Sequence, residues 1–89
     1  MPRPIHESDY RQLMDVLRQA RLRAQLDQTS VAEQLGKPQS FVSKYENGER
    51  TLNVIEFVAI CGILGLNPAQ EIALIGRRPR LRPRGPLKK

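Results

Sequence analysis

The sequence is poor in the residues that build disulfides, metal sites and large aromatic cores. Its 89 residues include one cysteine (Cys61), one histidine (His6) and no tryptophan. A single cysteine excludes an internal disulfide, and one histidine beside it cannot make a cluster of metal ligands. We therefore expect no metal and no cofactor, with Cys61 a small core residue rather than a redox switch and His6 a solvated terminal residue.

Long apolar runs are missing as well. No segment approaches the roughly 20 apolar residues that a transmembrane helix needs, and the first residues lack the apolar core of a signal peptide. The low cysteine content is typical of a reducing compartment. We expect a cytoplasmic, nucleoid-associated protein without a membrane partner.

Recognisable catalytic motifs are also lacking. The chain shows no nucleophile beside a base, no carboxylate pair in a credible pocket and no glycine-rich phosphate loop. Eighty-nine residues form one domain, and a domain near this size buries only about 60% of its unfolded surface, which leaves little room for a deep cleft. The sequence therefore predicts a binding protein rather than an enzyme.

Acidic residues are absent from the C-terminal segment. All nine precede Gly76, so the chain up to that glycine holds eight basic against nine acidic residues, a net charge of −1. The basic residues after it are Arg77, Arg78, Arg80, Arg82, Arg84, Lys88 and Lys89. Proline and charge at this density prevent a packed core, so we expect residues 77–89 to form a disordered basic arm. Such an arm attracts DNA, and a solubilising tail without a partner is the alternative.

Helical patterning is what the sequence does contain. It predicts an N-terminal extension at residues 1–8 and one all-α domain of five helices at residues 9–76. We expect the first helix to begin after Ser8 and to end near Gln25. Its apolar residues recur every three or four positions and form one stripe: Tyr10, Leu13, Met14, Leu17, Ala20 and Ala24.

Capping residues predict where the next two helices begin and end. Asp27 is suited to cap a second helix, and Gly36 to end it in the left-handed conformation. Pro38 is expected as the first residue of a third helix, which Asn47 and Gly48 end. The apolar residues of these two helices are Val31, Ala32, Leu35, Val42 and Tyr45.

Two further helices follow by the same logic. Asn53 and Glu56 make a capping box for the fourth helix, and Gly65 ends it. The expected buried face of that helix consists of Phe57, Val58, Cys61 and Leu64. The fifth helix has Asn67 as N-cap, Pro68 and Gln70 in its first turn, the apolar residues Ile72, Ala73 and Ile75, and Gly76 at its end.

Residues 26–50 therefore combine two short helices with a tight turn at Gly36, which is a helix-turn-helix arrangement. The pattern Gln-Ser-x-Val-Ser-Lys-Tyr-Glu-Asn-Gly at residues 39–48 resembles the Cro and cI-like, or XRE-type, helix-turn-helix family of transcriptional regulators. The resemblance extends over residues 13–75. It implies a lambda-repressor-like domain in which the helix at about 38–46 enters the major groove of DNA.

The exposed side of this third helix carries the candidate base-reading residues. Its apolar residues determine which side is buried and leave Gln39, Ser40, Ser43 and Lys44 outside. Glutamine can bind adenine N6 and N7 together, and lysine can reach guanine or a phosphate. The resemblance implies that Gln39, Ser40 and Lys44 read bases, with Ser43 nearer the DNA backbone. An ordinary solvated helix surface is the alternative.

Other positions are candidates for contacts with the DNA backbone, which set the register of reading. The resemblance implies phosphate contacts from Gln28, at the anion-favouring start of the second helix, and from Asn47. Lys37 and Arg50 flank the motif with positive charge. Phe41 is expected to touch a sugar or a thymine methyl group, with packing at the rim of the core as the alternative.

The resemblance also implies a structural ion pair. An arginine of the first helix pairs with the glutamate of Tyr-Glu-Asn-Gly, and these residues are here Arg21 and Glu46. Arg18 and Arg23 are competing partners on neighbouring turns. The pair would connect the first helix to the third.

Together these features predict a sequence-specific regulator of transcription that binds double-stranded DNA, and specifically a repressor. One helix-turn-helix contacts too few base pairs to choose a site in a genome, so we expect a homodimer on a palindromic operator, with the fifth helix supplying part of the contact. Two alternatives keep DNA binding but add a partner. One is an antitoxin of the HigA-like kind that binds a toxin, and the other is a controller or co-activator that recruits polymerase.

Overall fold

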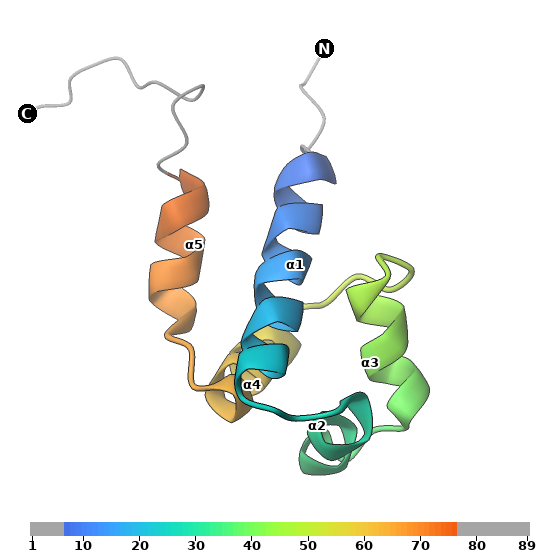
Figure 1. Ribbon diagram of the computed structural model, residues 1–89. Coiled ribbons are helices and arrows are strands. Elements are labelled where there is room, and N and C mark those ends of the chain that lie inside the picture. The colour runs from blue at the N-terminus through green and yellow to red at the C-terminus, as the bar shows by residue number, and fades with distance from the viewer. Residues whose placement is uncertain (1–6, 77–89) are drawn as a thin grey trace, which may run out of the picture.

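The computed structural model describes residues 7–76, which form five helices and no β-strand (Figure 1). The helices are α1 (Glu7–Arg23), α2 (Gln28–Leu35), α3 (Gln39–Glu46), α4 (Val54–Leu64) and α5 (Pro68–Gly76). The predicted all-α fold is confirmed. Expectations for His6 and for the basic tail at residues 77–89 lie outside the described residues.

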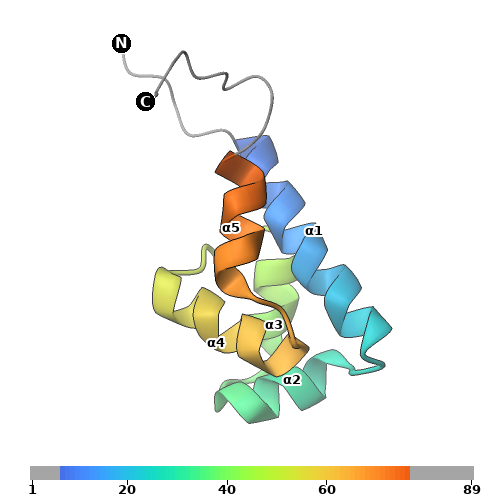
Figure 2. The same ribbon diagram turned by 90° about the vertical axis from the view of Figure 1, so that its left-hand side faces the viewer.

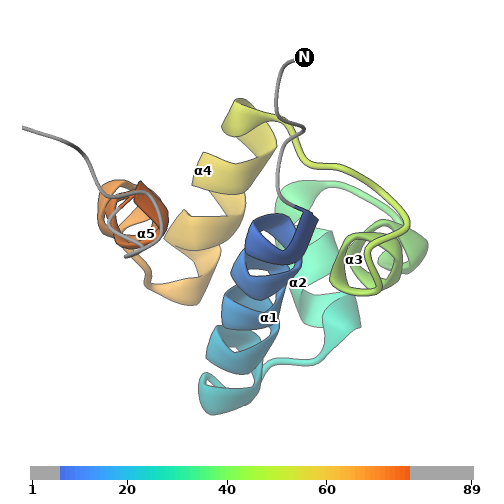
Figure 3. The same cartoon turned by 90° about the horizontal axis from the view of Figure 1, so that it is seen from above.

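Helix α1 is the central element. It contacts α3, α4 and α5, and Figures 1 and 3 show it between α5 on one side and α3 on the other. Met14, Leu17 and Ala20 are buried along its inner side. The predicted stripe was one turn too long, because α1 ends at Arg23 and Ala24 is exposed.

The end of α1 has a clear cause in the backbone. Gln25 adopts a left-handed conformation with φ of 61°, which a helix cannot continue. The N–H of Leu26 donates to the carbonyl of Arg21, and that of Gln25 to the carbonyl of Leu22. These two bonds form a Schellman motif, in which glycine is the usual left-handed residue.

The predicted caps of α2 are present, whereas the start of α3 differs by one residue. The Asp27 carboxylate accepts a hydrogen bond from the Ser30 N–H at 2.8 Å, and Gly36 closes α2 with φ of 69°. Pro38 is the N-cap of α3 rather than its first residue, because its ψ of 156° is extended. Gln39 therefore begins the helix and lies in its first turn.

The caps of α4 and α5 agree with the prediction. The Asn53 side chain accepts from the Glu56 N–H at 2.8 Å, while the Glu56 carboxylate accepts from the Asn53 N–H at 3.0 Å. Gly65 ends α4 with φ of 75°. The Asn67 side chain accepts from backbone N–H groups in the first turn of α5.

One residue was wrongly assigned to the buried face of α4. Val58 is 47% exposed, and Ile60 is fully buried in its place. Phe57, Ile60, Cys61 and Leu64 follow one another at spacings of three, one and three residues, which makes a single helical stripe. Val58 is one residue, or about 100°, around the helix from Phe57 and falls outside that stripe.

The core lies between the first four helices. Its buried members are Met14, Leu17 and Ala20 of α1, Val31 and Ala32 of α2, Phe41, Val42 and Tyr45 of α3, and Phe57, Ile60, Cys61 and Leu64 of α4. Burial raises the pKa of the Cys61 thiol to about 11. Within the described part of the chain, α5 adds no fully buried side chain. It therefore covers α1 and α4 from outside.

No single helix within residues 7–76 has the length and apolar composition to cross a membrane. Helices α4 and α5 meet those criteria only when taken together, and they are bent by 116°.

Candidate nucleic-acid interface

Helices α2 and α3 pack against each other through small and apolar side chains. Val31, Ala32 and Val42 are at most 1% exposed, and the N–H of Lys37 donates to the carbonyl of Ala32 to close the turn. This packing fixes which side of α3 faces outward. Figures 1 and 3 show α3 on the opposite side of α1 from α5.

The structure brings the predicted base-reading residues to one helix surface. Gln39 and Ser40 are exposed in the first turn of α3, and Lys44 is exposed in its last turn. Ser43 is half-buried between them. A helix that presents polar side chains from its first turn is the form in which recognition helices contact base edges.

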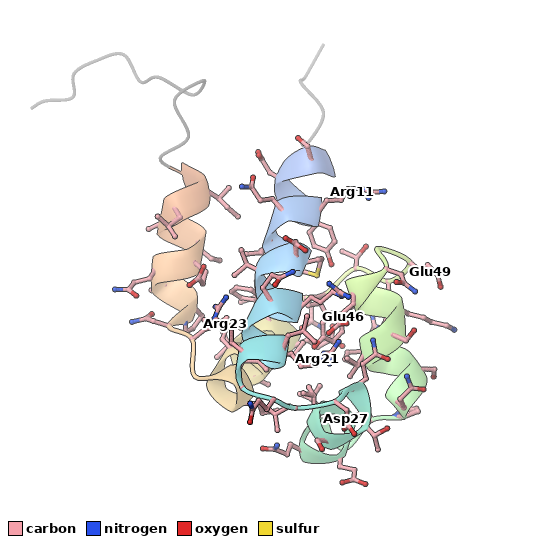
Figure 4. The ribbon with its side chains drawn as sticks, in the orientation of Figure 1. Arg11, Arg21, Arg23, Asp27, Glu46 and Glu49 are labelled. Atoms are coloured by element: carbon pink, nitrogen blue, oxygen red, sulfur yellow. The ribbon has the colours of Figure 1, made fainter. Side chains whose placement is uncertain are left out.

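A chain of hydrogen bonds links α1 to these residues through Glu46. Arg21 donates from Nε to Glu46 Oε2 at 2.7 Å and from Nη2 to Oε1 at 3.0 Å. The side chains of this pair are only 9% and 2% exposed, and Figure 4 shows them side by side between α1 and α3. The hydrogen bond with Glu46 raises the pKa of Arg21. The expected pair is thus present, while Arg18 and Arg23 are exposed.

Arg21 also reaches the start of α2. Its Nη1 donates to the carbonyl of Leu26 at 2.9 Å, one residue before the cap Asp27. One guanidinium group therefore holds the end of α1, the entry to α2 and the last turn of α3 together.

Glu46 also connects, through Gln28, to Gln39 in the first turn of α3. Gln28 donates from Nε2 to Glu46 Oε1 at 3.0 Å, and Gln39 donates from Nε2 to Gln28 Oε1 at 2.6 Å. Gln39 uses one of its two amide hydrogens in this way. Its other hydrogen and its carbonyl oxygen remain for a base, which is the pair that binds adenine N7 and N6.

The predicted backbone-contacting residues lie around α3. Lys37 and Asn47 are exposed at its two ends. Arg50 follows α3 and donates from Nη1 to the Thr51 carbonyl at 2.9 Å and from Nη2 to Glu56 Oε2 at 2.8 Å. These contacts keep the guanidinium beside α3 with three N–H groups left over, because arginine has five.

Comparison with known proteins identifies the group to which this arrangement belongs. The helix-turn-helix family HTH_3 matches residues 17–70, which include all of α2, α3 and α4. The chain belongs to this family. An XRE-family like protein from Pseudomonas syringae pv. tomato str. DC3000 has a similar structure, with 41% sequence identity and a TM-score of 0.77 over 88% of this chain and 92% of that chain. No curated protein matches the sequence.

Membership of HTH_3 has a general functional meaning. The XRE-type members of this fold are DNA-binding regulators of transcription, so this HTH_3 protein is a DNA-binding transcription regulator. The resemblance drawn from residues 39–48 is confirmed. The fold is not generally an enzyme fold.

Phe41 is the site residue of this HTH_3 protein whose position differs most from the expected DNA contact. It is 7% exposed, and its ring meets that of Tyr45 edge to face at 5.6 Å. The structure thus shows the alternative, packing at the rim of the core. The charged groups of Lys37 and Arg50 both lie over the ring.

Sequence reasoning missed two contacts in the HTH_3 site. The first is the bond between Gln28 and Gln39, because Gln28 was assigned only to phosphate. The second is the cluster of Phe41 with Lys37 and Arg50. Nothing in the spacing of Gln28 and Gln39 indicates the first contact, whereas an aromatic residue between two nearby cations in the sequence is a signal for the second.

Proposed function

We propose that this protein represses transcription by occupying a palindromic operator as a homodimer, with α3 of each protomer in the major groove. The observation that carries the proposal is the alignment of Gln39. Its side chain is exposed in the first turn of α3, is held by Gln28, and keeps a donor and an acceptor for a base. Ser40 and Lys44 extend the same surface and complete the base-reading set.

Contacts with the DNA backbone complete this reading surface. Gln28, Lys37, Ser43, Asn47 and Arg50 surround α3 and are assigned to phosphates. The arginines and lysines of residues 77–89 add positive charge for non-specific attraction. Phosphate contacts hold the register in which Gln39 meets its base.

Repression is the regulatory outcome that needs least beyond this surface. A protein that occupies an operator blocks polymerase without any further contact, whereas a controller or an antitoxin needs a second surface for polymerase or for a toxin. The DNA-reading surface described above supplies occupancy by itself. Repression is therefore the function that the geometry supports best.

The second copy is assigned to an apolar groove between α4 and α5. Val54 and Val58 of α4 and Ala69, Ile72 and Ala73 of α5 line this groove of about 480 Å³, and no charged residue of the described chain lines it. We call it the α4–α5 groove. Val54 is 70% exposed and Ile72 52%. An uncharged surface is unsuited to DNA phosphates and suited to an apolar partner.

The position of the groove fits a dimer that leaves both recognition helices accessible. Figure 2 shows α4 and α5 together on one face of the molecule. Figure 1 shows α3 on the opposite side of α1 from α5. Two protomers joined by a two-fold axis at the groove place the same residues opposite each other. Each α3 then remains open for one half of a palindrome.

Selection of bound duplexes from a random pool tests this function. We expect a palindromic sequence that contains the same half-site twice, followed by a footprint on that sequence near the protein's own gene. A reporter gene placed behind the selected site should lose expression when the protein is present. Recovery of no preferred sequence would contradict the proposal, and activation of the reporter would favour the controller. Loss of binding on addition of a co-encoded toxin would favour the antitoxin.

A further inference from the structure

Two cations that lie on either side of α3 in the sequence meet at one aromatic ring. Lys37 precedes α3, and its Nζ is 5.4 Å from the centroid of the Phe41 ring. Arg50 follows α3, and its Cζ is 4.7 Å from the same centroid. Both distances lie within the roughly 6 Å over which a cation is attracted to an aromatic ring.

The chain after α3 is folded back so that Arg50 reaches this ring. The N–H groups of Glu49 and Arg50 both donate to the carbonyl of Lys44, at 2.8 and 3.2 Å. The Tyr10 hydroxyl of α1 donates to the Arg50 carbonyl at 3.4 Å and accepts from the Leu52 N–H at 3.0 Å. The backbone around Arg50 is therefore tied to α1 and to α3.

The Arg50 side chain is held in addition by its own polar contacts. Thr51 and Glu56 accept from Nη1 and Nη2, yet the side chain is still 38% exposed and has three N–H groups to donate. Lys37 is exposed as well. Two like charges repel when they share a site, and the negative face of the Phe41 ring offsets that repulsion.

We propose that Phe41 is a positioning residue that aligns Lys37 and Arg50 as one phosphate clamp beside the first turn of α3. The inference rests on the proposed DNA-binding function and adds a specific mechanism to it. Phe41 follows Gln39 by two residues, so a phosphate held by this clamp fixes the register in which Gln39 meets its base. Side chains aligned before binding lose less conformational freedom when they bind.

A double-mutant cycle tests the clamp. Affinity is measured for the selected operator and for a scrambled duplex, with wild type, Phe41→Leu, Lys37→Ala/Arg50→Ala, and the triple variant. Leucine fills the core without an aromatic face. We expect Phe41→Leu to weaken binding to both duplexes by about three- to tenfold, in line with the loss of two cation–aromatic contacts. In the variant without the two cations, the same change should alter affinity less than about twofold.

Matched variants separate alignment from a general loss of packing. Ile60→Val shortens another buried side chain, fully buried on α4 and outside the lining of the α4–α5 groove, and should leave affinity unchanged in folded protein. Phe41→Tyr retains the ring and should bind as the wild type does. Melting curves establish that each variant is folded at the temperature of the assay, and Phe41→Met replaces Phe41→Leu in the cycle if the leucine variant is unfolded.

The outcomes distinguish the clamp from the underlying function. An equal effect of Phe41→Leu with and without the two cations overturns the clamp, and so does an equal loss of affinity in Ile60→Val. In either case a wild type that still prefers its operator leaves the proposed function intact. A wild type that binds neither duplex overturns both.

Discussion

Glu46 is the residue that connects the buried ion pair to the side chain proposed to read a base. Its carboxylate, 2% exposed, accepts from Arg21 on one side and from Gln28 on the other. Gln28 in turn holds Gln39. We therefore expect a change on α1 to alter the proposed base recognition without touching DNA, because hydrogen bonds connect Arg21 to Gln39 through Glu46 and Gln28.

Replacing Gln39, at one end of this series of hydrogen bonds, tests base reading directly. Gln39→Ala should lose about 1 to 3 kcal/mol of binding free energy on the preferred operator and relax the preference at one base pair in each half-site. Affinity for scrambled DNA should barely change. Isotherms on a panel of operators with single substitutions measure both effects. The control is Gln34→Ala, an exposed glutamine of α2, and equal weakening on every duplex would show that Gln39 does not read a base.

Replacing Arg21, at the other end of this series of hydrogen bonds, tests the stability of the fold. Arg21→Ala leaves the buried carboxylate of Glu46 without its charged partner, so the free energy of unfolding should fall by about 3 kcal/mol. Arg18→Ala removes an exposed arginine from the same helix and should change it by less than about 0.5 kcal/mol. Urea titrations measure both values. Equal stability of the two variants would mean that the Arg21–Glu46 pair contributes no more than a surface pair.

Residue identities predicted some of these contacts and not others. The Arg21–Glu46 pair follows from the resemblance at residues 39–48. The Gln28–Gln39 bond and the cations beside Phe41 depend on how closely two turns approach in space, and sequence spacing does not report that distance. Val58 was misplaced for a different reason, because the helical period by itself excludes it from the stripe of Phe57, Ile60, Cys61 and Leu64.

At the scale of elements, helix ends were the most predictable features. Asp27, Gly36, Asn53 and Gly65 cap helices where their chemistry suggests. Pro38 is one exception, since it precedes α3 instead of beginning it. Gln25 is another, since it takes the left-handed conformation that glycine usually occupies. The sequence predicted the end of α1 near Gln25, whereas the helix ends at Arg23, because a glutamine in the left-handed position gives no local signal of the kind that glycine gives.

The left-handed conformation of Gln25 predicts that glycine at this position makes the folded protein more stable. Gln25→Gly removes the steric cost of a φ of 61°, and we expect the free energy of unfolding to rise by about 0.5 kcal/mol after the added entropy of the unfolded chain is subtracted. Gln19→Gly, in the middle of α1 and exposed, should lower it by about 1 kcal/mol. Thermal unfolding compares the two. A loss of stability in both variants would show that the Gln25 side chain contributes more than its strain costs.

The cap of α2 predicts a dependence on pH. Hydrogen bonding from the Ser30 N–H lowers the pKa of Asp27 below its ordinary value of 3.8. The folded state therefore favours the carboxylate, so this contribution to stability is complete above pH 3.8 and is lost as the pH falls through the lowered pKa. Asp27→Asn keeps an acceptor that does not titrate. Unfolding measured between pH 7 and pH 2 should show a steeper acid loss for wild type than for Asp27→Asn, and parallel curves would contradict the prediction.

At the scale of the whole molecule, α3 and α5 lie on different sides of α1 (Figure 3), and α5 supplies one wall of the α4–α5 groove. The helical order and the four-helix core were predictable, since they follow from apolar periodicity and capping. The groove was predictable only as an excess of apolar residues in the fifth helix. Its uncharged lining required the structure, because residues of α4 and α5 approach each other there.

The α4–α5 groove leads to the prediction for assembly. Ile72→Lys places a charge in the groove at a residue that is 52% exposed in the protomer, so the fold should persist while the dimer is lost. In a two-fold dimer the change occurs twice, and the loss of two buried isoleucines should raise the dimer dissociation constant at least about a hundredfold. Sedimentation measures the mass of the particle, and isotherms compare a full palindrome with one half-site. The variant should bind the half-site as wild type does and should lose the steep binding to the palindrome.

Leu22→Lys is the matched control, since Leu22 is 45% exposed on α1 and does not line the groove. An Ile72→Lys protein with unchanged mass and unchanged binding to the palindrome would show that the second copy binds elsewhere.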